Sequence, residues 1–133
     1  MSSLQTLVKQ VLEFWPSHQK FLEKSKASID EISVADDLAT LVLRLTEARL
    51  GEALVGYKWM CDMMVEEEIE FRRTGNYRNT SFKEVEKIIY RNKDLMPRYM
   101  DGLLISQALW TNHVQAFKFY KNIFLNTVSN SQR

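Results

Sequence analysis

The sequence predicts an all-α protein, an antiparallel bundle of four to five helices with one long central helix and no sheet. Apolar residues recur at helical spacing along most of the chain, and no segment alternates apolar and polar residues as a strand does. Only 4 glycines and 2 prolines occur among 133 residues, too few for a chain rich in tight turns. We expect residues 1–133 to form a single helical domain.

The first helix is expected over residues 1–25. Leu4, Val8 and Val11 fall on one face of it. Pro16 lacks a backbone donor and disfavours a helical conformation in the residue before it, so the helix is expected to kink at this proline. A short polar linker follows.

The longest helix is expected over residues 34–74, opened by Ser33. Its apolar stripe contains two glycines, Gly51 and Gly56, and each costs about 1 kcal/mol relative to alanine in a helix interior. They mark either a break near Gly51 or a point of close contact with another helix, and one long helix with a weak point is the preferred interpretation. Gly75 stands where a left-handed residue closes a helix.

Two further helices are expected, over residues 81–91 and 94–126. Ser81 and Glu84 form a capping box at the start of the shorter one. The longer one tolerates Pro97 in its first turn. Its first half is apolar nearly all the way round, which is typical of a helix buried at the centre of a domain. The polar residues after this helix are expected to fray.

Composition and charge restrict the classes of function. Hydrophobic residues make up 45% and charged residues 26% of the chain, an ordinary globular balance. The net charge of +1 gives no electrostatic case for binding nucleic acid or an anionic membrane. A single cysteine, Cys61, excludes an internal disulfide and a multi-cysteine metal site. The N-terminus lacks a signal-peptide pattern and no run reaches the roughly 18 apolar residues of a membrane span, so we expect a cytoplasmic protein.

The densest acidic cluster, residues 66–70, has two interpretations. A carboxylate metal site inside a bundle usually needs Glu-x-x-His pairs on two helices, and the sequence contains none. We therefore expect no metal and prefer a solvated helix face, with Glu68 paired to Arg72 at one turn's spacing, worth about 0.2–0.5 kcal/mol. Glu68 also continues the apolar stripe, where a carboxylate needs a partner such as Arg72, Arg73 or Arg78.

His113 stands one turn after Trp110 and one turn before Phe117, with Ser106 on the same face. One interpretation is a proton-transfer or ligand-binding histidine in an aromatic-lined pocket. The preferred interpretation is a core histidine hydrogen-bonded to a carboxylate or a carbonyl, because no pair of nucleophile and base can be assigned from the sequence.

Two segments, YKWMCDMMVEEEIEFRRTGNYR (Tyr57–Arg78) and YMDGLLISQALWTNHVQAFKFY (Tyr99–Tyr120), resemble the helical N-terminal region of a group of bacterial class I S-adenosylmethionine-dependent methyltransferases. The resemblance covers roughly residues 36–124. In that family these helices precede a Rossmann-like core that holds the cofactor through a Gly-rich loop. The isolated glycines of this chain build no such loop, and the chain ends at Arg133, about where the first strand of the core is expected. The resemblance therefore implies S-adenosylmethionine only in an attached or partner catalytic domain, and no catalysis by this chain alone.

The resemblance implies an accessory helical domain that packs on a methyltransferase catalytic core as a cap over a small-molecule substrate, forms a homodimer interface, or both. Polar groups inside an apolar helix need mutual satisfaction or a ligand, which selects the polar and aromatic members of the matching segments as cap candidates. These candidates are Arg72, Arg73, Tyr77, Ser106, Gln107, Trp110, Asn112 and His113. The resemblance gives none of them a catalytic role.

Two rival functions belong to other classes. A stand-alone helical protein could bind a small apolar ligand between its helices, and it would be a monomer with a closed apolar cavity. A carboxylate-metal enzyme would bind metal at residues 66–70. The accessory domain, in contrast, would expose apolar surface and form a dimer or a larger species.

Overall fold

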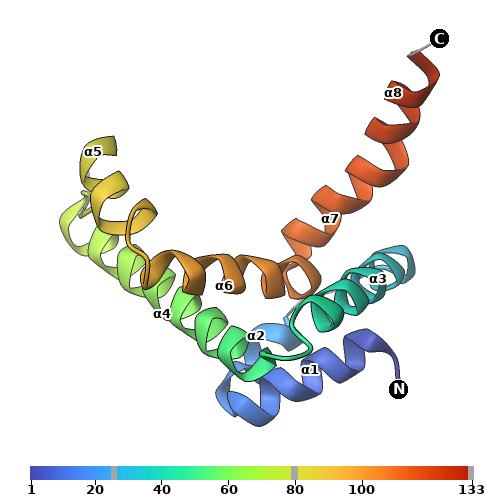
Figure 1. Ribbon diagram of the computed structural model, residues 1–133, viewed down its shortest axis with the longest axis horizontal. Helices are drawn as coiled ribbons and strands as arrows, with labels where there is room; N and C mark the ends of the chain where they lie inside the picture. Colours follow the sequence, from blue (N-terminus) through green and yellow to red (C-terminus); the bar gives the residue numbers. More distant parts are fainter. Residues whose placement is uncertain (25–26, 79–80, 132–133) are drawn as a thin grey trace. The chain divides into compact units, whose positions relative to one another are not determined.

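The chain is helical throughout the part that the structure describes. The computed structural model describes residues 1–24, 27–78 and 81–131, and it contains no strand within them (Figure 1). The predicted all-α class is confirmed, whereas the antiparallel bundle stays a prediction. Among the described residues, no helix combines the length and the apolar character that crossing a membrane requires.

Contacts within the chain separate it into two compact units. The first unit contains Met1–Glu47 and Ile105–Arg133, and the second contains Ala48–Leu104.

The first unit opens with α1 (Ser3–Phe14), a 3-10 turn (Pro16–His18) and α2 (Gln19–Glu23). A capping box starts α1, because the Ser2 hydroxyl accepts from the Gln5 N–H and the Gln5 side chain accepts from the Ser2 N–H. The helix ends at Trp15, whose backbone is not helical (φ −138°, ψ 77°), and Pro16 follows it. The interruption therefore lies at the proline, where the sequence predicted it.

Helix α3 (Ile29–Leu45) begins at Ser28 and not after Ser33 as expected. The Ser28 hydroxyl accepts from the Glu31 N–H and the Glu31 carboxylate accepts from the Ser28 N–H, which is a second capping box. Helices α1 and α3 pack on each other, and apolar side chains from both fill the core between them. These side chains are Leu7, Val11, Val34, Leu38 and Val42.

The long helix expected over residues 34–74 is two helices, α3 and α4 (Leu50–Thr74). The break lies at Thr46–Arg49, and Gly51 is the second residue of α4. The alternative of a break near Gly51 is therefore confirmed, and the preferred single long helix is wrong. At the end of α3 the Val42 carbonyl accepts from both the N–H and the buried hydroxyl of Thr46, at 3.0 and 2.7 Å, and the Thr46 backbone leaves the helical conformation (φ −107°, ψ 9°). At the other end of α4, Gly75 closes the helix in the left-handed conformation (φ 76°).

The second unit continues with α5 (Phe82–Val85), a π-helical turn (Glu86–Tyr90) and α6 (Leu95–Leu109), whose last residues belong to the first unit. The Ser81 hydroxyl accepts from the Glu84 N–H at the start of α5.

Two glycines allow α4 and α6 to approach closely. A Cβ atom added to Gly56 would lie 2.7 Å from the Arg98 carbonyl oxygen, and one added to Gly102 would lie 2.8 Å from the Met60 Cβ. Gly56 therefore marks close helix–helix contact, the second of the two alternatives. Beside this crossing the Asp101 carboxylate, largely buried, accepts from Arg49 at 2.7 Å, so the buried charge is paired.

Cys61 lies half-buried on α4. Burial raises the pKa of its thiol from 9.0 to about 11, against a smaller opposing effect of a hydrogen bond with Tyr57. The thiolate is the reactive form, and the higher pKa lowers the fraction of thiolate about 100-fold at neutral pH. A more basic thiolate is also a better nucleophile, which offsets part of this loss, so we expect a disulfide reagent to label the native protein about 10-fold more slowly than the urea-unfolded chain. Stopped-flow absorbance measures both rates, and equal rates would show that the thiol is not shielded.

The first unit ends with α7 (Thr111–Phe119), a π-helical turn (Tyr120–Phe124) and α8 (Leu125–Ser131). The continuous helix expected over residues 94–126 is interrupted at Trp110, whose backbone is extended (φ −94°, ψ 123°). The Trp110 N–H still donates to Ser106 and its carbonyl accepts from Val114, so only one residue leaves the helical conformation. Helix α8 also continues beyond the residue where fraying was expected.

Candidate functional site

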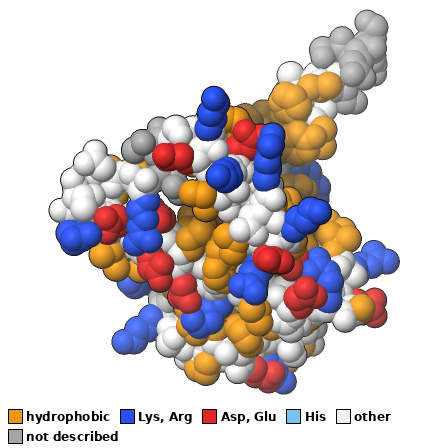
Figure 2. Space-filling view, turned by 60° about the vertical axis from the view of Figure 1, so that its left-hand side comes forward, with side chains coloured by type: hydrophobic (Ala, Val, Ile, Leu, Met, Phe, Trp, Pro, Cys, Tyr) orange, Lys and Arg blue, Asp and Glu red, His pale blue; other side chains and the backbone are white. Residues whose placement is uncertain are grey.

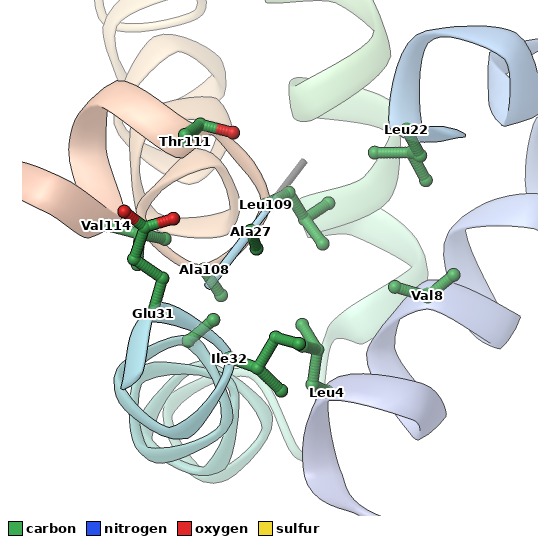
Figure 3. Close-up of a pocket in the computed structure, with 11 residues that line it drawn as sticks. Leu4, Val8, Leu22, Ala27, Glu31, Ile32, Ala108, Leu109, Thr111 and Val114 are labelled. Atoms are coloured by element: carbon green, nitrogen blue, oxygen red, sulfur yellow. The ribbon is translucent and has the colours of Figure 1, made fainter. Parts of the chain in front are cut away.

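An apolar pocket of about 500 Å³, partly open to solvent, lies in the first unit (Figure 3). Its walls come from α1, α2, the start of α3, the end of α6 and the start of α7. The larger apolar side chains that line it are Leu4, Val8, Leu22, Ile32, Leu109 and Val114. Ligand pockets in proteins usually measure about 300–1,000 Å³ and are mostly apolar, so the size and the lining both suit a small molecule.

Two polar residues, Glu31 and Thr111, also line this pocket. One oxygen of the half-buried Glu31 carboxylate accepts from the Ser28 N–H at 3.1 Å, and the other accepts from the Gln115 side-chain amide at 3.2 Å. In Figure 3 the Glu31 carboxylate reaches from α3 toward Val114. The pocket therefore has one wall with hydrogen-bonding groups and otherwise apolar walls.

A cluster of aromatic rings in the same unit contains both histidines of the chain. His18 is 5% exposed and lies between the rings of Trp15 (centroids 4.1 Å apart) and Phe21 (4.8 Å apart), both stacked on it. Phe21 meets Trp110 edge-on at 6.3 Å, and Trp110 stacks on His113 at 5.2 Å. These contacts connect the start of the chain to the α6–α7 junction through rings alone.

Burial lowers the pKa of His18 from its ordinary value of 6.5, because a charged imidazolium is costly among apolar rings. Below pH 6.5 the unfolded chain takes up a proton that the folded chain does not bind, so folding stability falls as the pH drops through 6.5 toward the lower folded pKa. We expect Tm to fall between pH 7.5 and pH 5.5, and the fall to be smaller in His18→Phe, which keeps a ring between Trp15 and Phe21. Calorimetry across this range measures both slopes. Equal slopes in the two proteins would show that other groups cause the dependence.

The Ser106 hydroxyl lies 3.0 Å from Nδ1 of His113, and the Gln107 side-chain amide lies 3.4 Å from the same nitrogen. Seven residues span about 10.5 Å along a straight helix, so the interruption at Trp110 is what allows Ser106 and His113 to meet. A hydroxyl and an imidazole at this distance resemble a nucleophile and its base. Ser106 is completely buried, however, and a substrate cannot reach it. The contact is better explained as a bond that orients His113 and joins α6 to α7.

The first unit holds five of the predicted cap candidates, and four of them meet. Ser106, Gln107 and Trp110 all contact His113. Asn112 is exposed. His113 is hydrogen-bonded as expected, but it is half-buried and not a core residue, and its partner is a serine hydroxyl in place of the expected carboxylate or carbonyl.

The other three candidates belong to the second unit, at or just beyond the end of α4. Arg72 pairs with Glu68 at 2.6 Å, as predicted, and Arg73 pairs with Glu70 at 2.9 Å. The ring of Tyr77 stacks on that of Phe71 with centroids 4.5 Å apart. Because both arginines are exposed, these ion pairs contribute little to stability.

The acidic cluster at residues 66–70 shows ion pairs and no metal geometry. The part of the chain that the structure describes has no group of three or more His, Cys, Asp or Glu residues arranged to hold a metal ion. Glu68 pairs with Arg72, but its carboxylate is exposed, so the expectation that its place on the apolar stripe makes a partner necessary is wrong.

The sequence reasoning missed His18 and the pocket. A signal for His18 existed in the three-residue spacing of Trp15, His18 and Phe21, which places three rings in succession along tight helical turns. The pocket left no comparable signal, because residues from both ends of the chain line it.

The described part of the chain is helical, and its first unit contains a largely apolar pocket. Compared with known protein families, with curated proteins and with solved structures, the chain shows no match.

Proposed function

We propose that this chain is an accessory helical domain of an S-adenosylmethionine-dependent methyltransferase, which packs on the catalytic core as a substrate cap, forms a homodimer, or both. The resemblance of Tyr57–Arg78 and Tyr99–Tyr120 motivates the family. The cofactor belongs to the attached or partner domain, and this chain is not catalytic alone. A cytoplasmic location and an antiparallel bundle of helices are parts of the same proposal.

Exposed apolar side chains carry this proposal. Large hydrophobic residues reach the surface between charged ones (Figure 2). In the second unit, α4 exposes Met64 (47%), Val65 (55%) and Ile69 (59%). A soluble monomer rarely leaves large apolar patches exposed, and patches bordered by polar residues mark protein interfaces.

The end of the first unit concentrates such residues on one segment, which we call the C-terminal apolar segment and define as residues 119–125. Its exposed members are Phe119, Tyr120, Ile123, Phe124 and Leu125. Tyr120, Ile123 and Phe124 follow Phe119 by one, four and five residues, which places these four on neighbouring positions of a helical surface, and the rings of Tyr120 and Phe124 stack with centroids 5.5 Å apart. A second copy or a catalytic core would bury this surface.

Light scattering coupled to size exclusion tests the homodimer. We expect a dimer whose dissociation constant rises in Phe124→Ser. Ile29→Ser is the matched control, because Ile29 is an exposed apolar residue of α3 outside the segment. A monomer at every concentration would contradict the dimer, and equal effects of the two substitutions would show that the C-terminal apolar segment is not its interface.

Calorimetric titration with S-adenosylmethionine tests the assignment of the cofactor to another domain. We expect no binding to this chain, because it lacks a Gly-rich loop. Measurable binding would contradict the proposal that the cofactor belongs to an attached or partner domain.

The pocket favours a second candidate function, a stand-alone protein that binds a small apolar ligand between its helices. Its volume of about 500 Å³ and its apolar walls support this function, although the pocket is partly open to solvent and not the closed cavity that this function predicts. Shifts of NMR signals from Leu4, Val8 and Val114 on titration with an alkyl compound would support it, and an unperturbed spectrum would contradict it.

A further inference from the structure

The pocket of the first unit has polar groups, Glu31 and Thr111, beside otherwise apolar walls, and this difference selects among apolar ligands. We infer that it binds a single-chain amphiphile with a cationic ammonium head, the alkyl chain lying against the apolar walls and the head on the Glu31 carboxylate. The inference rests on the second proposed function, the pocket as a ligand site.

The apolar walls suit an alkyl chain. Leu4 and Val8 stand one turn apart on α1, and Leu109 and Val114 contribute from either side of the α6–α7 junction. Figure 3 shows these side chains placed around the cavity. Burial of one methylene in such surroundings corresponds to about a fourfold gain in affinity, so binding should tighten with chain length.

The head-group wall is built around Glu31, the charged member of the lining. Two hydrogen bonds, from the Ser28 N–H and the Gln115 amide, hold its two oxygens in place. A carboxylate can accept about four hydrogen bonds, and these two donors occupy only part of them. The remaining acceptor positions can bind an ammonium head. The hydroxyl-bearing Thr111 lines the same pocket and adds to its polar side.

Among the residues that the structure describes, the charges around Glu31 leave this wall negative. Lys118 lines a neighbouring hollow that also includes Glu31, and its amine lies 4.0 Å from the Asp30 carboxylate. The charges of Lys118 and Asp30 offset each other. The start of α3 contributes a partial charge of about +0.5, which is smaller than the full negative charge of Glu31. An ammonium head is therefore attracted, whereas a carboxylate head meets a like charge.

Calorimetry or NMR titration with three compounds of equal chain length tests the inference. Decylamine, decanol and decanoate are compared at neutral pH and low salt, below their aggregation thresholds and where circular dichroism shows an unchanged fold. We expect decylamine to bind about 10-fold more tightly than decanoate, with signal shifts at Val8 and Val114. Glu31→Gln should weaken decylamine binding about 10-fold and leave decanol unaffected.

The variant Glu31→Gln keeps the start of α3 intact, because glutamine serves equally as the third residue of a capping box. Glu47→Gln makes the same change in net charge at an exposed residue outside the pocket, and it should leave the binding of all three compounds unchanged. If none of the compounds binds, the pocket is not a ligand site and the second proposed function fails. If decanoate binds as tightly as decylamine, or Glu31→Gln leaves decylamine binding unchanged, the head-group inference alone is overturned.

Discussion

Gly56→Ala is expected to lower the free energy of unfolding by about 2 kcal/mol, although alanine is the better helix former. The added Cβ would lie 2.7 Å from the carbonyl oxygen and 3.3 Å from the Cα of Arg98. These are backbone atoms of α6, so the clash is relieved only if α4 and α6 move apart. Overpacking of this kind typically costs about 1–3 kcal/mol or more, which exceeds the gain in helix propensity.

Gly51→Ala provides the matched control, because it makes the same substitution on the same helix. No atom lies within 4 Å of the Cβ that it would add, and its backbone is helical. Alanine should therefore raise the free energy of unfolding by about 0.5–1 kcal/mol. Urea denaturation of both variants measures effects of opposite sign. Stabilisation by both substitutions would contradict the close approach of α4 and α6.

Periodicity predicted the helices because burial of one face leaves a regular mark in the sequence. It did not predict the interruption at Trp110, because one residue that leaves the helical conformation hardly changes the apolar pattern on either side. The break at Thr46–Arg49 was predicted only as the less favoured alternative, through the glycine at position 51. The early start of α3 was predictable, since Ser28 and Glu31 form the S-x-x-E pattern of a capping box.

The candidate site was predictable only where its residues share one stretch of chain. Ser106, Trp110 and His113 were placed on a common face by their spacing, and they do meet. The same spacing indicated a straight helix, in which the bond between Ser106 and His113 would not form. The pocket depends on tertiary packing of Leu4 against segments more than a hundred residues further along the chain, and no local pattern records this.

Trp110→Ala is expected to lower the free energy of unfolding by about 3 kcal/mol, the lower end of the range for large aromatic residues deleted from cores. The sequence predicted a large effect because Trp110 stands in the most apolar part of the chain. In the structure the side chain is half-buried at the α6–α7 junction, where it contacts Phe21 and His113. Part of the indole already meets solvent in the native state, so its deletion removes less buried surface than a core tryptophan would.

Trp110→Phe separates the ring contacts from the bulk of the side chain. A phenyl ring can still stack on His113 and meet the edge of Phe21, so this variant should lose only about 1 kcal/mol. Urea denaturation followed by circular dichroism measures both variants without depending on tryptophan fluorescence. If Trp110→Ala leaves the midpoint unchanged, the ring does not connect α2 to the α6–α7 junction. If the two variants lose equal stability, the indole contributes through its size and not through the ring contacts on which the cluster of His18 and His113 depends.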